Sequence, residues 1–341
     1  MVTITIDAMG GDNAPDAIVE GAVRAIKEYR NISVLLIGRE DVVAGSLAKF
    51  LPSGDPRITI RHAEQVVAMD DIPSQIVRGK RDSSIHVGLR LVKEGEAQAF
   101  YSAGNTGAVM ATALVTLRQL EGIDRPAIAT VLPSMSGYSV MTDVGANVDS
   151  KENHYLHYAI MGSAYAKKIL KLDAPKVGLL SIGEEDVKGN ETTKHVFTML
   201  KECEALNFIG NVEAKEIYKG KADVIVCDGF VGNIALKSSE AVASFINKLL
   251  KDEIKGSVLN MIGALFMMGG LKRFKKRVDY EEYGGAPLLG LNGVCIIGHG
   301  SSSAMAAKNA IRVAKEMVET GMNAAIKEDV KNSFALLRGE A

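Results

Sequence analysis

Short runs of β-branched and aliphatic residues alternate with longer amphipathic segments along almost the whole chain, and this alternation strongly constrains the fold. The short runs predict strands at 2–7, 32–37, 57–61, 97–101, 127–132, 139–143, 176–181, 223–227 and 293–297. The amphipathic segments predict helices at 14–29, 40–50, 84–94, 106–118, 151–170, 190–201, 231–255 and 302–319. Such alternation is typical of a doubly wound, three-layer α/β/α fold.

One pair of strands departs from this pattern. The runs at 127–132 and 139–143 are joined by PSMSG, which is too short for a crossover helix, so we expect them to pair antiparallel. The predicted sheet is therefore mixed and mostly parallel. Because no long Pro, Ser or Gly linker interrupts the chain, the sequence favours a single α/β domain over residues 1–341, with a two-lobed arrangement as the alternative.

Composition narrows the classes of function. The 341 residues, 47% of them hydrophobic, suffice for a large core, and a net charge of −1 gives no general attraction for nucleic acid. Neither a signal peptide nor a membrane-spanning segment is apparent, so a cytoplasmic protein is expected. Cys203, Cys227 and Cys295 have no metal or redox spacing, and we expect all three to be reduced.

Polar, glycine-rich turns stand where six of the predicted strands give way to helices. In chain order they read DAMGGDN (7–13), SAGNTGA (102–108), DVGANVD (143–149), SIGEEDVKGN (181–190), CDGFVGN (227–233) and GHGSSS (298–303). Open α/β sheets bind ligands at the carboxyl ends of their strands, glycine admits close backbone approach, and helix N-termini favour anions. We therefore expect the six turns to meet around a phosphate-like ligand.

The turns match no standard nucleotide motif. None fits G-x-x-x-x-G-K-[ST], and GHGSSS is only an incomplete G-x-G-x-x-G, so neither an NTPase loop nor a dinucleotide fingerprint is supported. One glycine-rich turn is usually only a turn, but six polar ones are harder to explain by structure alone. No cofactor is expected.

The six turns, with RGKRDSS (78–84) and EYGGAPLLG (282–290), resemble the motif series of bacterial phosphate acyltransferases, the acyl-carrier-protein:phosphate transacylases that open phospholipid synthesis. The resemblance extends from residue 1 to about residue 320. It implies an isopropylmalate-dehydrogenase-like fold shared with phosphate acetyltransferases, and a homodimer. It also implies a reversible reaction in which inorganic phosphate attacks a long-chain acyl carrier protein, and the acyl phosphate formed passes to a membrane enzyme that acylates glycerol 3-phosphate.

The residue chemistry fits that reaction. Phosphate is largely a dianion above about pH 6 to 7, as phosphoesters are, so no activated serine or cysteine is required. The step needs a site that holds phosphate in line with the thioester and donates to the developing oxyanion. Lys188 and Asn233 are the catalytic candidates, with a solvated lysine and a plain helix N-cap as their alternative interpretations.

Substrate-binding candidates come from the turns and from the basic segment before the helix at 84–94. That segment suits phosphate, or the phosphopantetheine and acidic surface of a carrier protein, and a solvated basic turn is the alternative. Its candidates are Arg78, Lys80, Arg81, Ser83 and Ser84. Asp7 and Asp12 are expected to orient cations or backbone amides. The other candidates are Gly10, Gly11, Asn13, Asn105, Thr106, Asp143, Asn147, Asn190, Asp228, His299 and Ser301.

Three histidines have separate interpretations. His154 and His157 are three residues apart on a predicted helix, but no third ligand is apparent, so no metal site is expected. His299 either protonates the leaving thiolate or is a hydrogen-bonded structural residue.

Residues 257–278, SVLNMIGALFMMGGLKRFKKRV, are apolar on nearly all sides and then strongly basic. An apolar stretch of about 14 residues cannot span a bilayer, but beside Lys and Arg it suits a surface that dips into anionic lipid. The predicted membrane contacts are Leu265, Phe266, Met267, Lys272 and Arg273. A buried helix or a dimer contact is the alternative.

The stripe before this segment predicts an ordinary core-facing helix. It consists of Val242, Phe245, Ile246, Leu249 and Leu250.

Three other functions compete with the long-chain acyltransferase: a phosphate acetyltransferase that uses acetyl-CoA, a dehydrogenase of the related fold, and a non-catalytic membrane adaptor.

Overall fold

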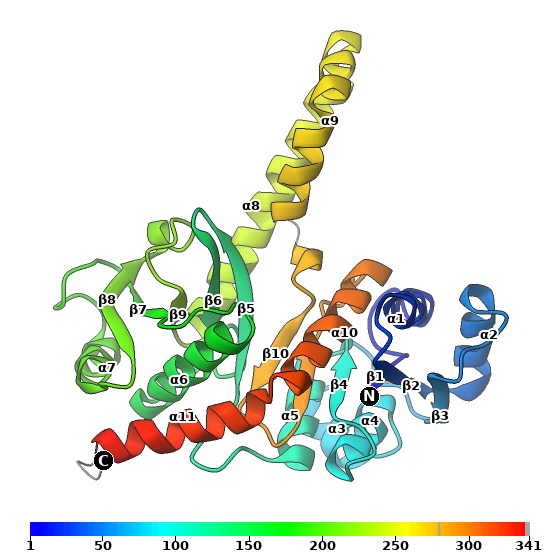
Figure 1. Ribbon diagram of the computed structural model, residues 1–341, viewed down its shortest axis with the longest axis horizontal. Helices are drawn as coiled ribbons and strands as arrows, with labels where there is room; N and C mark the ends of the chain where they lie inside the picture. The colour runs from blue at the N-terminus through cyan, green and yellow to red at the C-terminus, as the bar shows by residue number, and fades with distance from the viewer. Residues whose placement is uncertain (279, 338–341) are drawn as a thin grey trace.

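The computed structural model describes residues 1–278 and 280–337. Its strands form one eleven-stranded sheet in the order β3-β2-β1-β4-β11-β10-β5-β6-β9-β7-β8 (Figure 1). The strands are β1 (Val2–Asp7), β2 (Ile32–Gly38), β3 (Ile58–His62), β4 (Ala99–Ser102), β5 (Ala127–Ser134), β6 (Gly137–Thr142), β7 (Lys176–Ser181), β8 (Asn207–Glu213), β9 (Val224–Val226), β10 (Ala286–Leu289) and β11 (Val294–Ile297).

The sheet is mixed, as expected, and the antiparallel pairs lie together in its middle. β5 pairs antiparallel with β6, which confirms the prediction from the short PSMSG connection. The sequence patterns did not reveal β10, which pairs antiparallel with both β11 and β5. β1 to β4 and β11 therefore form one parallel half of the sheet, and β6 to β9 form a second parallel half of opposite direction.

Helices cover both faces of the sheet, so the doubly wound, three-layer arrangement is confirmed. One face carries α1 (Asp16–Glu28), α2 (Glu40–Phe50), α6 (Glu152–Lys168), α7 (Glu191–Glu202), α10 (Ala304–Glu319) and α11 (Met322–Leu337). The other carries α3 (Pro73–Gly79), α4 (Ser84–Lys93), α5 (Thr106–Leu117) and the first turns of α8 (Gly229–Lys255). Short 3₁₀ helices lie at η1 (Ala214–Glu216) and η2 (Tyr280–Glu282).

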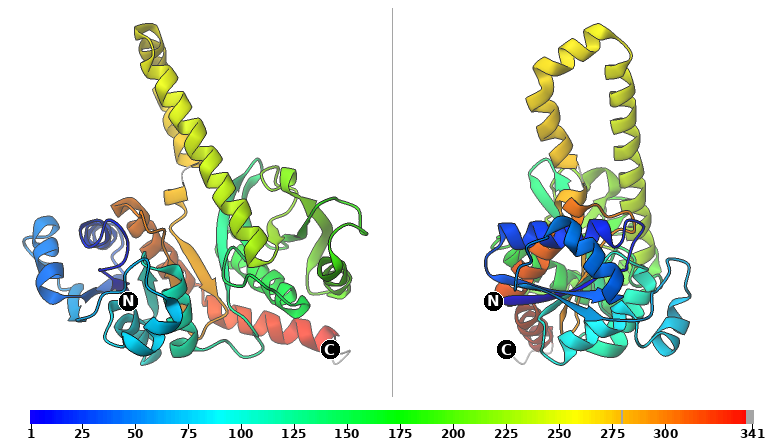
Figure 2. Two further views of the ribbon diagram at one scale, coloured as in Figure 1. Left: turned by 180° about the vertical axis from the view of Figure 1, so that it is seen from behind. Right: turned by 90° about the vertical axis from the view of Figure 1, so that its right-hand side faces the viewer.

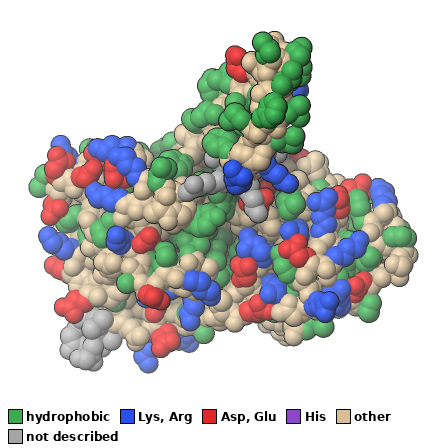
Figure 3. All heavy atoms as spheres, turned by 45° about the horizontal axis from the view of Figure 1, so that its top comes forward, with side chains coloured by type: hydrophobic (Ala, Val, Ile, Leu, Met, Phe, Trp, Pro, Cys, Tyr) green, Lys and Arg blue, Asp and Glu red, His purple; other side chains and the backbone are tan. Residues whose placement is uncertain are grey.

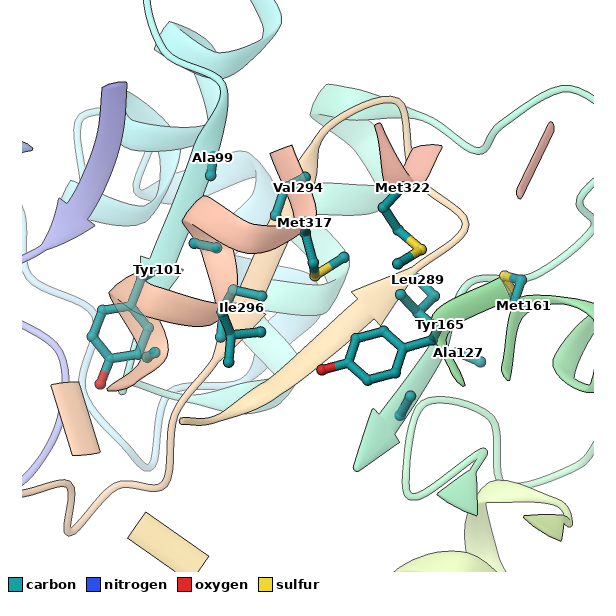
Figure 4. Packing of buried hydrophobic residues seen from close by; sticks show 14 of the residues in the cluster. Ala99, Tyr101, Ala127, Met161, Tyr165, Leu289, Val294, Ile296, Met317 and Met322 are labelled. Atoms are coloured by element: carbon teal, nitrogen blue, oxygen red, sulfur yellow. The ribbon is translucent and has the colours of Figure 1, made fainter. Parts of the chain in front are cut away.

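The largest hydrophobic cluster runs across the middle of the sheet and joins its two halves. Met161 and Tyr165 of α6 lie near Leu289 of β10, while Ile296 of β11 and Met317 of α10 continue the cluster toward β4 (Figure 4). Each of these five side chains is at most 2% exposed. Burial of side chains of this size contributes about 1.5–3 kcal/mol each. The predicted state of Cys203, Cys227 and Cys295 is confirmed, because all three are buried free thiols.

α8 and α9 (Val258–Val278) form a hairpin that projects from the body of the molecule (Figures 1 and 2). The prediction that the α8 stripe faces a core is wrong for this single chain, since Phe245 is 61% exposed and Leu249 is 49% exposed. The reason is that α8 leaves the sheet after its first turns. Among the described helices, none is long and apolar enough to cross a membrane.

Candidate active site

A cavity of about 1230 Å³ lies between the two halves of the sheet and is lined along α8 from Asn233 to Lys255. Five of the six glycine-rich turns contribute lining residues to it, and representatives are Asp12, Thr106, Val144, Asn233 and His299. The twist of the sheet allows turns from strands of opposite direction to approach one another. The expectation that all six turns converge is only partly met, because no described residue of 181–190 lines this cavity.

The turns after β1, β4 and β11 pack tightly against one another, and we call residues 7–13, 102–108 and 298–303 the glycine wall. A side chain on Gly10 would collide with the Asp7 carboxylate and lie 2.8 Å from the Gly104 nitrogen. Gly11 has φ +101°, and a Cβ there would lie 2.9 Å from the Gly300 carbonyl oxygen. The wall therefore requires glycine at both positions, for close approach and for backbone conformation.

Asp7 is a fully buried carboxylate inside the glycine wall. It accepts hydrogen bonds from the Ser102 hydroxyl at 2.7 Å and from the Met9 N–H at 3.1 Å, and Ser84 also bonds to it. Burial raises the pKa of Asp7, while these hydrogen bonds act in the opposite direction. Asp7 thus shapes the backbone of the wall and lies beneath the surface that a ligand would contact.

Asn13 also bonds within the wall. Its amide donates to the carbonyls of Ser301 at 3.1 Å and Ser302 at 3.3 Å, and the Asp12 N–H donates to the Gly300 carbonyl at 2.7 Å. Asn13 and Ser301 therefore tie the first turn to the last one. Asp12 itself is exposed and lines the cavity.

Asn105 forms the N-cap of α5 and holds a distant segment. Its side-chain oxygen accepts from the Ala108 N–H at 3.0 Å, and its amide donates to the carbonyls of Met69 and Asp71 at 3.0 and 2.9 Å. The neighbouring Thr106 is exposed and lines the cavity.

The basic segment at 78–84 divides into anchored and exposed residues. Lys80 forms an ion pair with Asp71, and Ser83 is the N-cap of α4, where it accepts from the His86 N–H at 3.4 Å. Ser84 is buried next to Asp7, as noted above. Arg78 and Arg81 are exposed and do not line the cavity.

The turn after β6 folds around the carboxylate of Asp143. This carboxylate accepts from the N–H groups of Ile128 (3.0 Å), Gly145 (3.2 Å), Ala146 (3.0 Å) and Asn147 (2.7 Å), and from the Asn147 side-chain amide (3.1 Å). With its acceptors occupied, the Asp143 carboxylate is a scaffold for the turn. The Asn147 side-chain amide also donates to the Pro126 carbonyl at 2.8 Å.

Asp228, not Asn233, caps the long helix α8. The Asp228 carboxylate accepts from the Val231 N–H at 2.8 Å and from the Tyr155 hydroxyl at 3.1 Å. The N-cap alternative for Asn233 is therefore wrong, because α8 begins at Gly229 and Asn233 lies in its second turn. Asn233 faces the cavity and lies 3.7 Å from where a side chain on Gly145 would begin, so its amide is available to a ligand.

Lys188 lies on the turn after β7, which we call the β7 turn (182–190). Its side chain is exposed, and no ion pair holds its ammonium group within the described part of the chain. Gly189 has φ +116°, and Asn190 is the N-cap of α7, accepting from the Thr193 N–H at 2.8 Å. Asn190 is therefore a helix cap, while the cation beside it remains accessible.

A residue that sequence reasoning missed supports the β7 turn. Asn211 of β8 is 3% exposed, and its amide donates at 2.8 Å to the Glu185 carbonyl, which also accepts from the Lys188 N–H at 3.0 Å. The β7–β8 register shifts just before Asn211, where Gly210 has φ +96°. Such a bulge re-aims the next side chain, and here it explains how Asn211 reaches the turn.

The histidines occupy structural and cavity positions. His154 accepts from the Lys151 N–H at 3.0 Å, and His157 accepts from the Asp124 N–H at 3.4 Å. Both therefore use a ring nitrogen to bind backbone. His299 lines the cavity, and its Nδ1 lies 2.7 Å from the Ser301 hydroxyl.

Away from the glycine wall the cavity becomes apolar. Leu132 and Pro133 of β5 face it from the sheet, and Leu236, Ala243 and Ile246 face it from α8. One continuous space therefore joins a backbone-rich polar wall to an apolar surface that could accommodate a hydrocarbon chain.

Comparison with known proteins identifies close relatives. The family model described as "Fatty acid synthesis protein" matches residues 2–325. A phosphate acyltransferase of Desulfitobacterium hafniense (strain DSM 10664 / DCB-2) is 52% identical over 330 residues, which cover 96% of this chain and 97% of that protein. A phosphate acyltransferase of Acidobacterium capsulatum is 47% identical over 329 residues, covering 96% and 97%.

Solved structures share the fold at low sequence identity. A phosphotransacetylase from Streptococcus pyogenes has a TM-score of 0.62 and 18% identity, over 93% of this chain and 94% of that one. A 4-hydroxythreonine-4-phosphate dehydrogenase from Klebsiella pneumoniae has a TM-score of 0.51 and 12% identity, over 95% and 98%. These likenesses confirm the expected isopropylmalate-dehydrogenase-like fold.

Proposed function

The chain belongs to the phosphate acyltransferase family, and we propose that it transfers a long-chain acyl group from acyl carrier protein to inorganic phosphate. The observation that carries this proposal is the single cavity that joins the glycine wall to the apolar surface of β5 and α8. The wall offers backbone N–H groups and helix N-termini to an anion, and the apolar surface offers a place to an acyl chain.

In the proposed step a phosphate oxygen attacks the thioester carbonyl carbon. The new carbon–oxygen bond forms, the carbon–sulfur bond breaks, and the carrier protein leaves as a thiolate that takes up a proton. Asn233 donates to the carbonyl oxygen as it becomes an oxyanion. Lys188 neutralises the phosphate or the oxyanion, and because its turn does not line the cavity, this role requires the β7 turn to move toward the bound substrates. His299, at the cavity edge, is the candidate proton donor to sulfur.

The decisive experiment compares acyl donors. Purified protein is given palmitoyl carrier protein or acetyl-CoA, with phosphate supplied or omitted, and acyl phosphate is measured. We expect phosphate-dependent product from the palmitoyl donor. Product from acetyl-CoA alone would favour the phosphate acetyltransferase alternative, and phosphate-independent turnover would contradict the proposal.

We also propose that the α8–α9 hairpin mediates association with a second copy and with a membrane surface. The part of the α8 stripe that does not line the cavity is exposed, and it forms an apolar face that a second chain would cover in a homodimer: Phe245, Leu249 and Leu250. On α9, Leu265 is 63% exposed and Phe266 is 87% exposed, with Met267 also exposed. Hydrophobic side chains gather on the projecting hairpin (Figure 3). Lys272 and Arg273, exposed on the returning helix, suit anionic lipid.

A cytoplasmic protein held peripherally at the membrane would release acyl phosphate close to a membrane enzyme that acylates glycerol 3-phosphate. Leu265→Glu combined with Phe266→Glu should abolish sedimentation with anionic vesicles and leave turnover in solution unchanged. Vesicle binding that persists in this double variant would contradict membrane contact through the tip.

A further inference from the structure

Met69 is the one residue of the described segment 66–72 that lines the cavity. It is 47% exposed. Its terminal methyl carbon lies 2.9 Å from where a side chain on Gly300 would begin, so the thioether lies against the glycine wall. A side chain on Gly300 would require the flexible end of Met69 to shift.

The backbone around Met69 is held from one side by Asn105. The amide of Asn105 donates to the carbonyls of Met69 at 3.0 Å and Asp71 at 2.9 Å, with a longer bond to Ala68 at 3.4 Å. Because Asn105 is itself fixed as the N-cap of α5, the segment is coupled to the turn after β4.

Lys80 holds the same segment from the other side. Its ammonium group pairs with the Asp71 carboxylate and donates to the Val66 carbonyl at 2.9 Å. The Asp71 carboxylate also accepts from the Ala68 N–H at 2.7 Å. These contacts fix the backbone on both sides of Met69 while leaving its side chain without a polar anchor.

This combination separates Met69 from an ordinary exposed apolar residue. Single exposed apolar side chains are common and need no explanation. Here, polar side chains from three segments fix the backbone of a residue whose flexible, polarizable side chain faces the cavity. The polar groups of Lys80 and Asn105 bond to this segment, so both residues are better placed to position Met69 than to bind phosphate directly.

We propose that Met69 is a specificity-determining residue that contacts the apolar carbons next to the thioester of the bound acyl donor. Asp71, Lys80 and Asn105 are positioning residues that act through it. This inference rests on the proposed function and deepens it, because it assigns a contact to the donor and none to phosphate. Met69 lies beside the wall where phosphate and thioester would meet, so it can contact the donor there.

The test separates the Michaelis constants of the two substrates. Met69→Ala should raise KM for palmitoyl carrier protein by about tenfold, from the loss of a partly buried thioether contact, and leave KM for phosphate within about twofold. Ile72→Ser is the matched control, since Ile72 lies on the same segment, is 55% exposed and does not line the cavity. This control should change neither constant.

Lys80→Met distinguishes positioning from phosphate binding. If Lys80 acts through Met69, this variant raises KM for the donor, and adding Met69→Ala causes no further rise. A selective rise in KM for phosphate would overturn the positioning role. An unchanged donor KM in an active Met69→Ala enzyme, or an equal rise in Ile72→Ser, would overturn the inference alone. Absence of turnover by the wild-type protein with either donor would overturn the proposed function and this inference with it.

Discussion

The glycine wall and the β7 turn are both rich in glycine, acidic residues and asparagine, but their polar side chains have different contacts. In the wall, Asp7 and Asn13 bond to other parts of the wall, so a ligand would meet mainly backbone. In the β7 turn, Lys188 is exposed, and its main chain is held through one buried amide, that of Asn211. A rigid backbone surface thus stands apart from a cation on a less constrained loop.

The difference teaches that polar residues in a ligand-binding turn need not touch the ligand. The residue types alone suggest that three side chains in the turns bind a ligand: Asn105, Asp143 and Asp228. Their hydrogen-bonding atoms are instead bonded to other groups of the protein. Asn233 and Lys188, the catalytic candidates, have no comparable engagement in the described structure. Loss of a scaffold residue should therefore disturb binding and stability together, and loss of an accessible residue should disturb turnover alone.

The largest effect is expected for Lys188→Ala. Removing an accessible charge that stabilises the transferring group should lower kcat at least about tenfold while thermal unfolding stays unchanged. Steady-state kinetics and a melting curve measure the two quantities. Lys194→Ala, which removes an exposed lysine from the adjoining helix α7, is the control. Near-normal kinetics in Lys188→Ala would reject the catalytic role and the contrast drawn above.

Gly10→Ala in the glycine wall should lower the stability of the protein and weaken phosphate binding. The added methyl would overlap the Asp7 carboxylate and the Gly104 backbone, and overpacking of this kind costs about 1–3 kcal/mol of unfolding free energy. KM for phosphate should rise as the wall shifts. Gly45→Ala is the control, because a methyl there has nothing within 4 Å and should stabilise helix α2 by up to about 1 kcal/mol. Unchanged stability in Gly10→Ala would show that the wall is less rigid than its geometry indicates.

Asn211→Leu probes the support of the β7 turn. Leucine preserves the volume of this buried side chain but removes the hydrogen bond to the Glu185 carbonyl. A net loss of about 1 kcal/mol in holding the loop corresponds to about fivefold in kcat. The double variant with Lys188→Ala should be no slower than Lys188→Ala alone. Asn207→Leu, on the same strand but bonded to Ala174, is the control; an equal loss of kcat there would indicate a general effect on β8.

Local sequence patterns predicted nine of the described strands, and they failed where the physical cause was not local. β8 was missed because the bulge at Gly210 breaks its alternation. β10 was missed because Ala286–Leu289 is short and contains proline, yet it joins the two halves of the sheet by pairing antiparallel with both β11 and β5. Helix α11 was also missed, because the pattern after α10 gave no clear start signal.

The same limit applied to the candidate site. The sequence showed which turns carry glycine and polar side chains, and five of them do line one cavity. It could not show which side chains the protein uses itself. The partners of Asn105 lie more than 30 residues earlier in the chain, and the carbonyl held by Asn211 lies on another loop. Such long-range hydrogen bonds leave no periodic signal.

The buried carboxylate of the glycine wall and an exposed carboxylate of the β7 turn should give opposite dependences of protein stability on pH. Burial raises the pKa of Asp7 in the glycine wall, so the folded protein binds this proton more tightly than the unfolded chain, whose aspartates have a pKa of about 3.9. The stability contributed by Asp7 is therefore lost as the pH rises above about 4. Lys221 instead lowers the pKa of the exposed Glu184 in the β7 turn, so that contribution is present above about pH 4.3 and is lost as the pH falls.

Urea unfolding between about pH 3 and 8 measures both contributions, because the Asp7 contribution changes above about pH 4 and the Glu184 contribution changes below about pH 4.3. Relative to wild type, Asp7→Asn should gain unfolding free energy as the pH rises, by about 1.4 kcal/mol for each unit by which the folded pKa is raised. Glu184→Gln should show a small difference of the opposite sign, which grows as the pH rises toward about 4.3 and is constant above it, and which salt reduces because the ion pair with Lys221 is exposed. Parallel pH profiles for the two variants would mean that the wall does not bury its charge differently from the β7 turn.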